Sequence, residues 1–350
     1  MSLGPVMLGI AGPVLSAAER DWLRHPAVGG VILFTRNYAS PEQVTSLTAQ
    51  IHAARTPPLL IAVDQEGGPV QRFRDGFTRL PPVNRLGRVY DQDPVRARHL
   101  AAQCGWLMAA ELRAVGVDLS FAPVLDLDRG VSAVIGERAF HRDPEVVADL
   151  AQHYIHGMQR AGMAAVGKHF PGHGSVAADS HRALPVDPRP LETLGVEDLL
   201  PFERAADQGI PGVMIAHVLY PAIDAQLAGY SRYWIHDVLR ARLRFQGAVF
   251  SDDLGMVAAH GAGTLTDRAN VALTAGCDMV LVCNEGEATG AVLDALAGYR
   301  DPAAQMRLAR MRGGGHGLAR DAMCQLPEWS QAVSDIAACD PDPELGLDLA

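Results

Sequence analysis

The segment KHFPGHGSVAADSH, residues 168–181, concentrates a lysine, three histidines and an aspartate in a short stretch of chain. Three residues prevent a regular helix there: Pro171, Gly172 and Gly174. Lys168 and His169 follow an apolar run and should end a strand, whereas Asp179 and His181 lie further along an irregular loop. In an extended loop the Asp-x-His spacing brings both side chains to one face, where the carboxylate can orient and charge the imidazole. The pattern therefore indicates a functional loop.

The length of this loop supports the same interpretation. We expect about 27 residues before the next helix, and loops of that length in compact domains are usually functional. His173 is expected to bond within the loop rather than to react. Metal binding is the alternative, but the spacing of His169 and His173 with Pro-Gly between them only half meets the requirement for ligands on one rigid element. No metal ion is expected.

A second motif, AVFSDDLGM, closes an apolar run with two adjacent carboxylates, Asp252 and Asp253. Adjacent residues of a strand face opposite sides, so only one of the two can enter a cavity at the strand end. We assign the inward position to Asp252. Asp253 should cap the next helix or bond to backbone groups.

Further polar groups sit at or near predicted strand ends. VDQEGGPVQRF provides Asp64 and, after a Gly-Gly turn, Arg72. A carboxylate and a guanidinium can together hold two neighbouring hydroxyls, although a structural ion pair would look the same. IGERAF provides Arg138, which could equally be a surface arginine. The remaining strand-end groups are Asp126, Asp128 and His217. One charge at a strand end can simply leave the core for solvent, but charges at five strand ends together favour a site.

The elements that must position these groups form a regular series. Short, continuously apolar runs are typical of buried parallel strands. They occur at residues 6–10, 29–34, 59–65, 117–127, 164–170, 212–217, 247–253 and 278–283. Helical patterns separate them, and several end in Gly just before the next run. The alternation predicts an α/β fold of the (β/α)₈ TIM-barrel type, with its active site at the carboxyl ends of the strands. A doubly wound open sheet is the alternative, but its G-x-G-x-x-G fingerprint is missing.

The domain organisation follows from the same pass along the chain. We expect one domain over residues 1–350, with the barrel over about 5–300 and a helical extension over about 301–350. The tail past Gly317 should pack outside the barrel.

Composition narrows the classes of partner. The net charge is −10 and no Lys/Arg cluster resembles a nucleic-acid footprint, so nucleic acids are not expected partners. Five scattered cysteines without a CxxC pair indicate reduced thiols in the cytoplasm. No apolar run approaches about 18 residues and the N-terminus lacks signal-peptide features, so no membrane association is expected.

In this order, the segments resemble the β-N-acetylhexosaminidases of glycoside hydrolase family 3, especially the single-domain bacterial branch that acts in peptidoglycan recycling. The resemblance spans roughly residues 1–300. It rests on GGVILFTRN, VDQEGG, APVLDL, IGERAF, KHFPGHG, DSH and FSDDLGM. KHFPGHG with a downstream DSH is highly specific to this branch. One departure is Pro69, where the family usually has a basic residue after D-Q-E-G-G, and this should alter a flank of the sugar site.

The resemblance implies a retaining hydrolase, without a cofactor, that removes terminal N-acetylglucosamine from GlcNAc-β-1,4-anhydroMurNAc-peptides. It makes Asp252 the nucleophile of a covalent glycosyl-enzyme and His181 the acid/base, with Asp179 as its partner. The residues that it assigns to sugar binding are Asp64, Arg72, Arg138, Lys168 and His169. The loop of His181 is expected to close over substrate. The partner would be this small carbohydrate, and the protein a monomer or weak dimer.

Three other interpretations remain open from the sequence. Lys168 at a strand end could be a Schiff-base nucleophile, as in barrel aldolases. A metal-dependent hydrolase is a second interpretation. The third is a non-catalytic barrel that binds amino sugars, which would be expected to have lost Asp252 or His181.

Overall fold

The computed structural model describes residues 3–314 and 317–339. Eight strands close into a parallel barrel in the order β1-β10-β9-β8-β7-β6-β3-β2. Their bounds are β1 (Val6–Gly9), β2 (Val28–Leu33), β3 (Leu60–Val63), β6 (Leu119–Ser120), β7 (Ala164–Phe170), β8 (Gly212–Ile215), β9 (Ala248–Asp253) and β10 (Met279–Val282). Because β1 pairs with both β2 and β10, the sheet has no open edge. The barrel prediction is confirmed and the open sheet is excluded.

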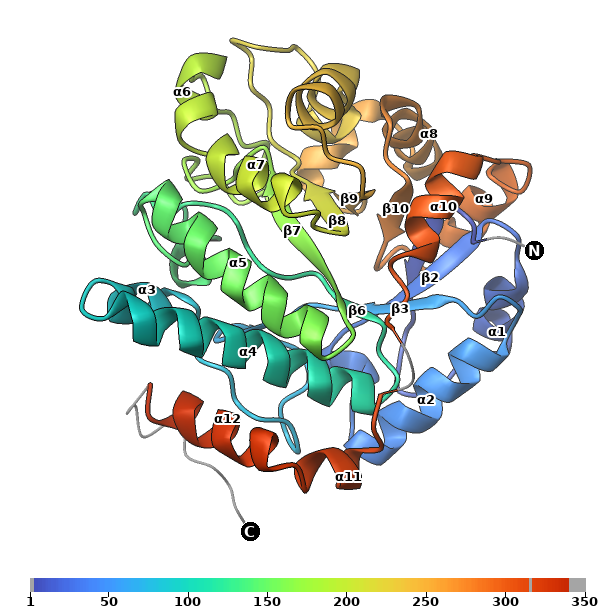
Figure 1. The fold of residues 1–350 in the computed structure, drawn as a ribbon. Helices are drawn as coiled ribbons and strands as arrows, with labels where there is room; N and C mark the ends of the chain where they lie inside the picture. Colours follow the sequence, from blue (N-terminus) through green and yellow to red (C-terminus); the bar gives the residue numbers. More distant parts are fainter. Residues whose placement is uncertain (1–2, 315–316, 340–350) are drawn as a thin grey trace.

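Helices surround the barrel, as Figure 1 shows. Those between successive strands are α1 (Ala17–Arg24), α2 (Pro41–Ala53), α3 (Asn84–Tyr90), α4 (Pro94–Ala114), α5 (Pro144–Arg160), α6 (Leu191–Val196), α7 (Leu199–Asp207), the π-helix η4 (Tyr233–Arg242) and α8 (Leu265–Ala275). After β10 come α9 (Ala288–Ala295), α10 (Pro302–Ala309), α11 (Arg320–Cys324) and α12 (Pro327–Ala337). Six of these helices begin at side chains that accept a first-turn backbone amide, namely Ser16, Ser40, Asp93, Asp143, Thr264 and Asp301. Each such cap is worth about 1 kcal/mol.

The barrel interior is packed with apolar side chains. Met7, Phe121 and Phe250 belong to one buried cluster that also contains Leu308 and Met311 from α10 and the residues just after it. Helix α10 therefore closes the amino end of the barrel, and the chain as far as Met311 contributes to its core. The carboxyl end is left for the site.

The C-terminal helices pack outside the barrel, as predicted for the tail past Gly317. Helix α12 lies along α4 (Figure 1). The indole Nε1 of Trp329 donates to Glu111 Oε1 at 3.1 Å, and Arg160 of α5 bonds Glu328. The part of the predicted extension over residues 340–350 lies outside the described residues.

Strand β6 is much shorter than the predicted run over 117–127. Pro123 has no amide hydrogen and cannot take part in a regular ladder. The chain continues beside β7 through irregular bonds, from Val166 N to Ala122 O at 2.9 Å and from Leu125 N to Lys168 O at 2.6 Å. This places Asp126 next to the end of β7.

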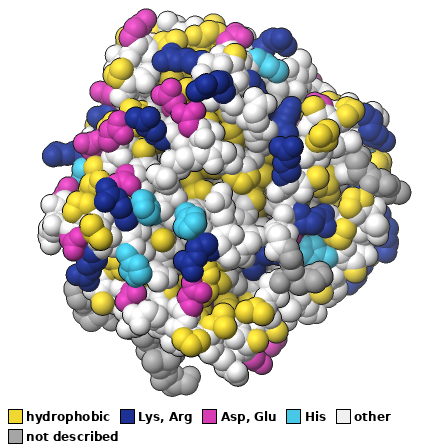
Figure 2. All heavy atoms as spheres, in the orientation of Figure 1, with side chains coloured by type: hydrophobic (Ala, Val, Ile, Leu, Met, Phe, Trp, Pro, Cys, Tyr) yellow, Lys and Arg dark blue, Asp and Glu magenta, His cyan; other side chains and the backbone are white. Residues whose placement is uncertain are grey.

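Within residues 3–314 and 317–339, none of the helices combines the length and the apolar character that crossing a bilayer requires. Figure 2 shows acidic and basic side chains interspersed over the face seen in Figure 1. Charge on this face is mixed rather than of one sign.

Candidate active site

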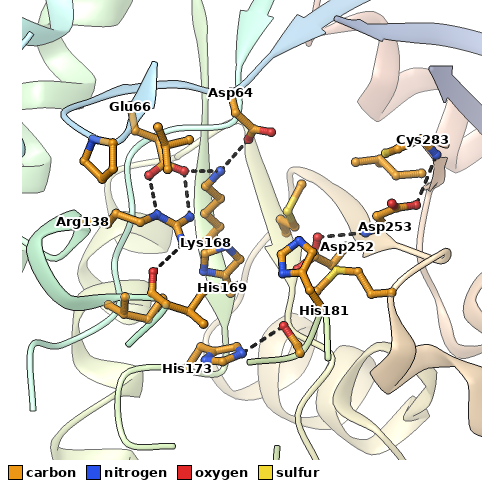
Figure 3. Close-up of a pocket in the computed structure, with 18 of the residues that line it drawn as sticks. Asp64, Glu66, Arg138, Lys168, His169, His173, His181, Asp252, Asp253 and Cys283 are labelled. Atoms are coloured by element: carbon orange, nitrogen blue, oxygen red, sulfur yellow. Dashed lines mark hydrogen bonds and ion pairs between the residues drawn. The ribbon is translucent and has the colours of Figure 1, made fainter. Parts of the chain in front are cut away.

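A cavity of about 460 Å³ opens at the carboxyl ends of the barrel strands (Figure 3). Its volume is within the usual range of about 300–1,000 Å³ for small-molecule sites. Seven of the predicted site residues line it: Asp64, Arg72, Arg138, Lys168, His169, His181 and Asp252. The eighth, Asp179, does not line the cavity and bonds His181 instead.

One side of the cavity is a network of buried charges. Lys168 Nζ lies 2.7 Å from Asp64 Oδ1 and 2.7 Å from Glu66 Oε1. Arg138 donates to both oxygens of Glu66, from Nε at 2.8 Å and from Nη2 at 2.9 Å. Arg138 is therefore not a surface arginine, since its side chain is only 13% exposed. Figure 3 shows these four residues gathered on one side of the cavity.

Glu66 lines the cavity but was not among the residues predicted from the sequence. A signal was available, because residues two apart on an extended chain share a face and Glu66 follows Asp64 by two. The segment forms a hairpin of β4 (Gln65–Gly67) and β5 (Val70–Gln71). Within it the Gln65 side chain accepts the Arg72 amide at 2.9 Å. Arg72 is thereby held near Asp64, with Nη2 3.9 Å from Oδ2.

The network fixes the charges of its members. Burial would raise the pKa of Glu66, but the charges of Arg138 and Lys168 outweigh it and hold that pKa well below its usual range. Burial would lower the pKa of Lys168, but Asp64 and Glu66 outweigh it and raise that pKa. Lys168 is thus held as an ammonium ion. A Schiff-base lysine must be deprotonated, so the aldolase interpretation is not supported.

Asp252 and Asp253 at the end of β9 make different contacts, but both line the cavity, whereas only Asp252 was predicted to enter it. Asp253 Oδ1 accepts the backbone amides of Gly255 at 3.0 Å and Cys283 at 3.2 Å, which confirms that it bonds to backbone. Asp252 accepts the Asp253 amide at 2.8 Å and faces the cavity, although Asp253 also contributes to the lining.

The two carboxyl groups also differ in electrostatics. Burial raises the pKa of Asp253. Burial would do the same for Asp252, but His169 and His217, the Asp253 amide and Lys168 outweigh it and lower its pKa. Asp252 is therefore an ionised carboxylate at neutral pH.

The loop after β7 carries the Asp179–His181 pair. It covers residues 171–190, which is shorter than expected because α6 starts at Leu191, ahead of the predicted helix. His181 Nδ1 lies 3.0 Å from Asp179 Oδ1, and the same oxygen accepts the His181 amide at 2.9 Å. The His181 ring lines the cavity while 66% of its side chain stays exposed. The loop is joined to the chain after β9 by a bond from Ala258 N to Ser180 O at 3.1 Å.

Other predicted strand-end groups have structural positions. His173 Nε2 lies 3.2 Å from Ser180 Oγ, so it bonds within the loop as expected. His217 is fully buried, with Nε2 3.1 Å from Asp253 O, and it does not line the cavity. Asp126 does not line the cavity but bonds the ring of His169, which does. Asp128 lines a separate hollow together with Arg129. Over the described ranges 3–314 and 317–339, the structure has no group of three or more potential metal-ligating side chains.

Comparison with known proteins adds to this geometry. Residues 7–308 match the model of the glycosyl hydrolase family 3 N terminal domain. A β-hexosaminidase of Thioalkalivibrio sulfidiphilus is 58% identical over 349 residues, which cover 100% of both chains, and one of Alkalilimnicola ehrlichii matches equally well. The crystal structure of NagZ from Neisseria gonorrhoeae in complex with N-trifluoroacetyl-D-glucosamine is similar at a TM-score of 0.92 and 45% identity, over 97% of this chain and 98% of that chain.

These matches run against the interpretation as a non-catalytic sugar-binding barrel. The relatives are named as enzymes, they match along the whole chain, and both Asp252 and His181 line the cavity. The chain belongs to glycosyl hydrolase family 3 and is a glycoside hydrolase with β-hexosaminidase activity.

Proposed function

We propose that the enzyme releases terminal, non-reducing β-linked N-acetylglucosamine with retention of anomeric configuration, using Asp252 as nucleophile and His181 as acid/base. The observation that carries the proposal is a buried carboxylate with a lowered pKa facing the same cavity as an imidazole bonded to a carboxylate partner. Retaining glycosidases need one nucleophile and one proton donor on the two sides of the scissile bond.

The reaction then has two steps. Asp252 attacks the anomeric carbon while His181 gives its proton to the departing glycosidic oxygen, and a covalent glycosyl-enzyme results. His181 next removes a proton from water, which attacks the anomeric carbon and frees Asp252. An ionised Asp179 only accepts hydrogen bonds, so it keeps a proton on His181 Nδ1 and leaves Nε2 to transfer protons. The exposure of His181 suits a loop that closes over bound substrate.

The sugar would be held by the charged side of the cavity. Asp64 offers acceptor oxygens, and Arg72, Arg138 and Lys168 offer donors. Their mutual bonds fix them before substrate arrives, which reduces the entropy lost on binding. His169, the fifth predicted sugar-binding residue, also lines the cavity and lies close enough to Asp252 to influence its charge.

The proposed substrates are GlcNAc-β-1,4-anhydroMurNAc-peptides derived from peptidoglycan. Support comes from the KHFPGHG and DSH segments and from the similarity to NagZ of Neisseria gonorrhoeae. The free thiols of Cys104, Cys277, Cys283 and Cys324 agree with a reducing compartment, so the proposal places the reaction in the cytoplasm. The enzyme would act as a monomer or weak dimer.

The deciding experiment is hydrolysis of 4-nitrophenyl N-acetyl-β-glucosaminide by the wild type and by the Asp252→Ala and His181→Ala variants. We expect turnover by the wild type, loss with Asp252→Ala and a strong decrease with His181→Ala. Proton NMR of the first product should show the β anomer, and an initial α anomer would exclude retention. A 5-fluoro N-acetylglucosaminyl donor should label the peptide that contains Asp252. Activity that survives Asp252→Ala would move the nucleophile elsewhere, with Asp253 next to test.

A further inference from the structure

Asp126 is a fully buried carboxylate that the mechanism above does not use. Its side chain has no exposed surface and does not line the cavity, and it lies on the irregular stretch that follows β6 and runs beside β7. Asp126 Oδ2 lies 2.6 Å from His169 Nδ1 and accepts the His169 amide at 3.2 Å, and Oδ1 accepts the His173 amide at 2.6 Å. One carboxylate thus bonds the ring of His169 and the backbone amides of both His169 and His173.

The bonding pattern requires a carboxylate. Both oxygens act as acceptors, one for His169 and the other for His173. An amide has the same shape but only one acceptor oxygen, so asparagine could satisfy one of the two sides and would oppose a donor to the other. Leaving a buried donor without an acceptor is costly.

The same contact decides the proton position on His169. Burial would raise the pKa of Asp126, but the charges and bonds of His169 and His173 outweigh it and lower that pKa. An ionised carboxylate cannot donate, so His169 Nδ1 must carry the proton. The ring lines the cavity, and Nε2 has no hydrogen-bond partner in the described part of the chain. In a neutral ring with this tautomer, Nε2 is a hydrogen-bond acceptor.

We propose that Asp126 is a positioning residue that holds His169 as the Nδ1–H tautomer and aims its Nε2 at a hydroxyl of the bound sugar. The inference rests on the proposed function, since it concerns how the same cavity recognises an N-acetylglucosaminide. It identifies a second layer beneath the site in which a carboxylate orients a binding histidine. Asp126 itself touches no substrate.

The test compares Asp126→Asn with the wild type on 4-nitrophenyl N-acetyl-β-glucosaminide and on its 3-, 4- and 6-deoxy analogues. Asp128→Asn is the matched control, because Asp128 is two residues along the chain, its side chain accepts the Gly130 amide at 3.0 Å, and it lies outside the cavity lining. We expect Asp126→Asn to lower kcat/KM for the parent substrate about 10- to 100-fold, mainly through KM. For one deoxy analogue the loss should be much smaller, because the hydroxyl that His169 reads is already absent.

A merely structural role would give a different pattern. Asp126→Asn would then lower kcat/KM for all four substrates by one common factor, and that result would overturn the proposal. An Asp126→Asn protein with unchanged kcat/KM for all four substrates would also overturn the proposal. A wild type inactive on every substrate would instead refute the proposed function.

A measurement on the wild type covers the case in which Asp126→Asn does not fold. Long-range ¹H–¹⁵N NMR spectra of the imidazole rings, with the His169 signal assigned by its loss in His169→Gln, report which nitrogen is protonated. We expect a neutral ring that is protonated on Nδ1 alone. A neutral ring with its proton on Nε2 would contradict the proposal whatever the variant does.

Discussion

Glu66 illustrates, at the scale of one residue, how buried charges hold the sugar side of the cavity. Its carboxylate bonds Arg138 through two nitrogens and Lys168 through one, and its side chain is 5% exposed. Glu66→Gln would leave two buried cations short of negative charge. Breaking a buried pair in this way typically costs about 3–5 kcal/mol. We expect a loss of that order in the free energy of unfolding, measured by urea denaturation.

The control for this variant is Glu328→Gln, which removes a half-exposed ion pair with Arg160. Exposed pairs are worth at most about 1 kcal/mol, so Glu328→Gln should change stability little. Equal losses in the two variants would show that the buried network does not contribute as inferred.

The pH dependence of the Glu66 contribution has a definite sign. The folded-state pKa of Glu66 lies below the ordinary value of 4.5, so the folded state favours the ionised form. The stabilisation is complete above pH 4.5 and is lost as the pH falls through the folded-state value. The stability difference between wild type and Glu66→Gln should therefore be constant near neutral pH and shrink in acid. A difference that grows in acid would contradict this assignment.

At the scale of elements, the loop over residues 171–190 depends on an anchor at its far end. Arg189 Nη2 bonds Asp187 at 2.7 Å, and its Nη1 bonds Asp198 at 2.8 Å and Glu197 at 3.0 Å. Arg129 from the loop after β6 also bonds Glu197, at 2.6 Å. These bonds tie the loop to the start of α7 and to the neighbouring loop.

Loosening this anchor should affect the chemical step more than substrate binding. Arg189→Met should lower kcat on the order of tenfold and change KM little, because the acid/base pair on the loop loses its position while the sugar-binding network stays intact. Arg204→Met, which removes an exposed pair with Glu145, is the control. Steady-state kinetics on 4-nitrophenyl N-acetyl-β-glucosaminide measures kcat and KM separately. A rise in KM at unchanged kcat would contradict the assigned role of the loop.

The same scale shows what the sequence could and could not predict. Continuous apolar runs were enough to locate all eight barrel strands, because buried parallel strands impose that pattern. The early end of β6 depends on how Pro123 interrupts pairing with β7, which apolar composition does not reveal. Strand alternation correctly predicted that Asp253 would bond to backbone groups, but not that it would also line the cavity. Local spacing could place Glu66 on the same face as Asp64. Its bonds to Arg138 and Lys168, and those of Asp126 to His169, join distant segments, so no local pattern specified these partners.

At the scale of the whole molecule, the C-terminal helix α12 is separated from the chemistry. It packs along α4, and Trp329 Nε1 donates to Glu111 Oε1 at 3.1 Å. Glu111 is buried, which raises its pKa, and it also accepts the Thr78 amide and hydroxyl at 2.9 and 2.6 Å. Helix α12 thus covers a buried carboxyl group on the outer side of α4, whereas the cavity opens at the carboxyl ends of the barrel strands.

This separation predicts that stability and activity respond independently to changes in α12. Trp329→Ala should lower the free energy of unfolding by about 1–3 kcal/mol, since it removes a partly buried indole and a hydrogen bond to Glu111. Thermal unfolding measures the loss, and kcat and KM on 4-nitrophenyl N-acetyl-β-glucosaminide should stay within about twofold of wild type while the variant is folded. Trp329→Phe keeps most of the apolar contact and loses only the hydrogen bond. Its free energy of unfolding should therefore lie between those of the wild type and Trp329→Ala. A large loss of kcat in a folded Trp329→Ala protein would mean that α12 influences the cavity through α4, and the barrel and its C-terminal helices would then have to be treated as one catalytic unit.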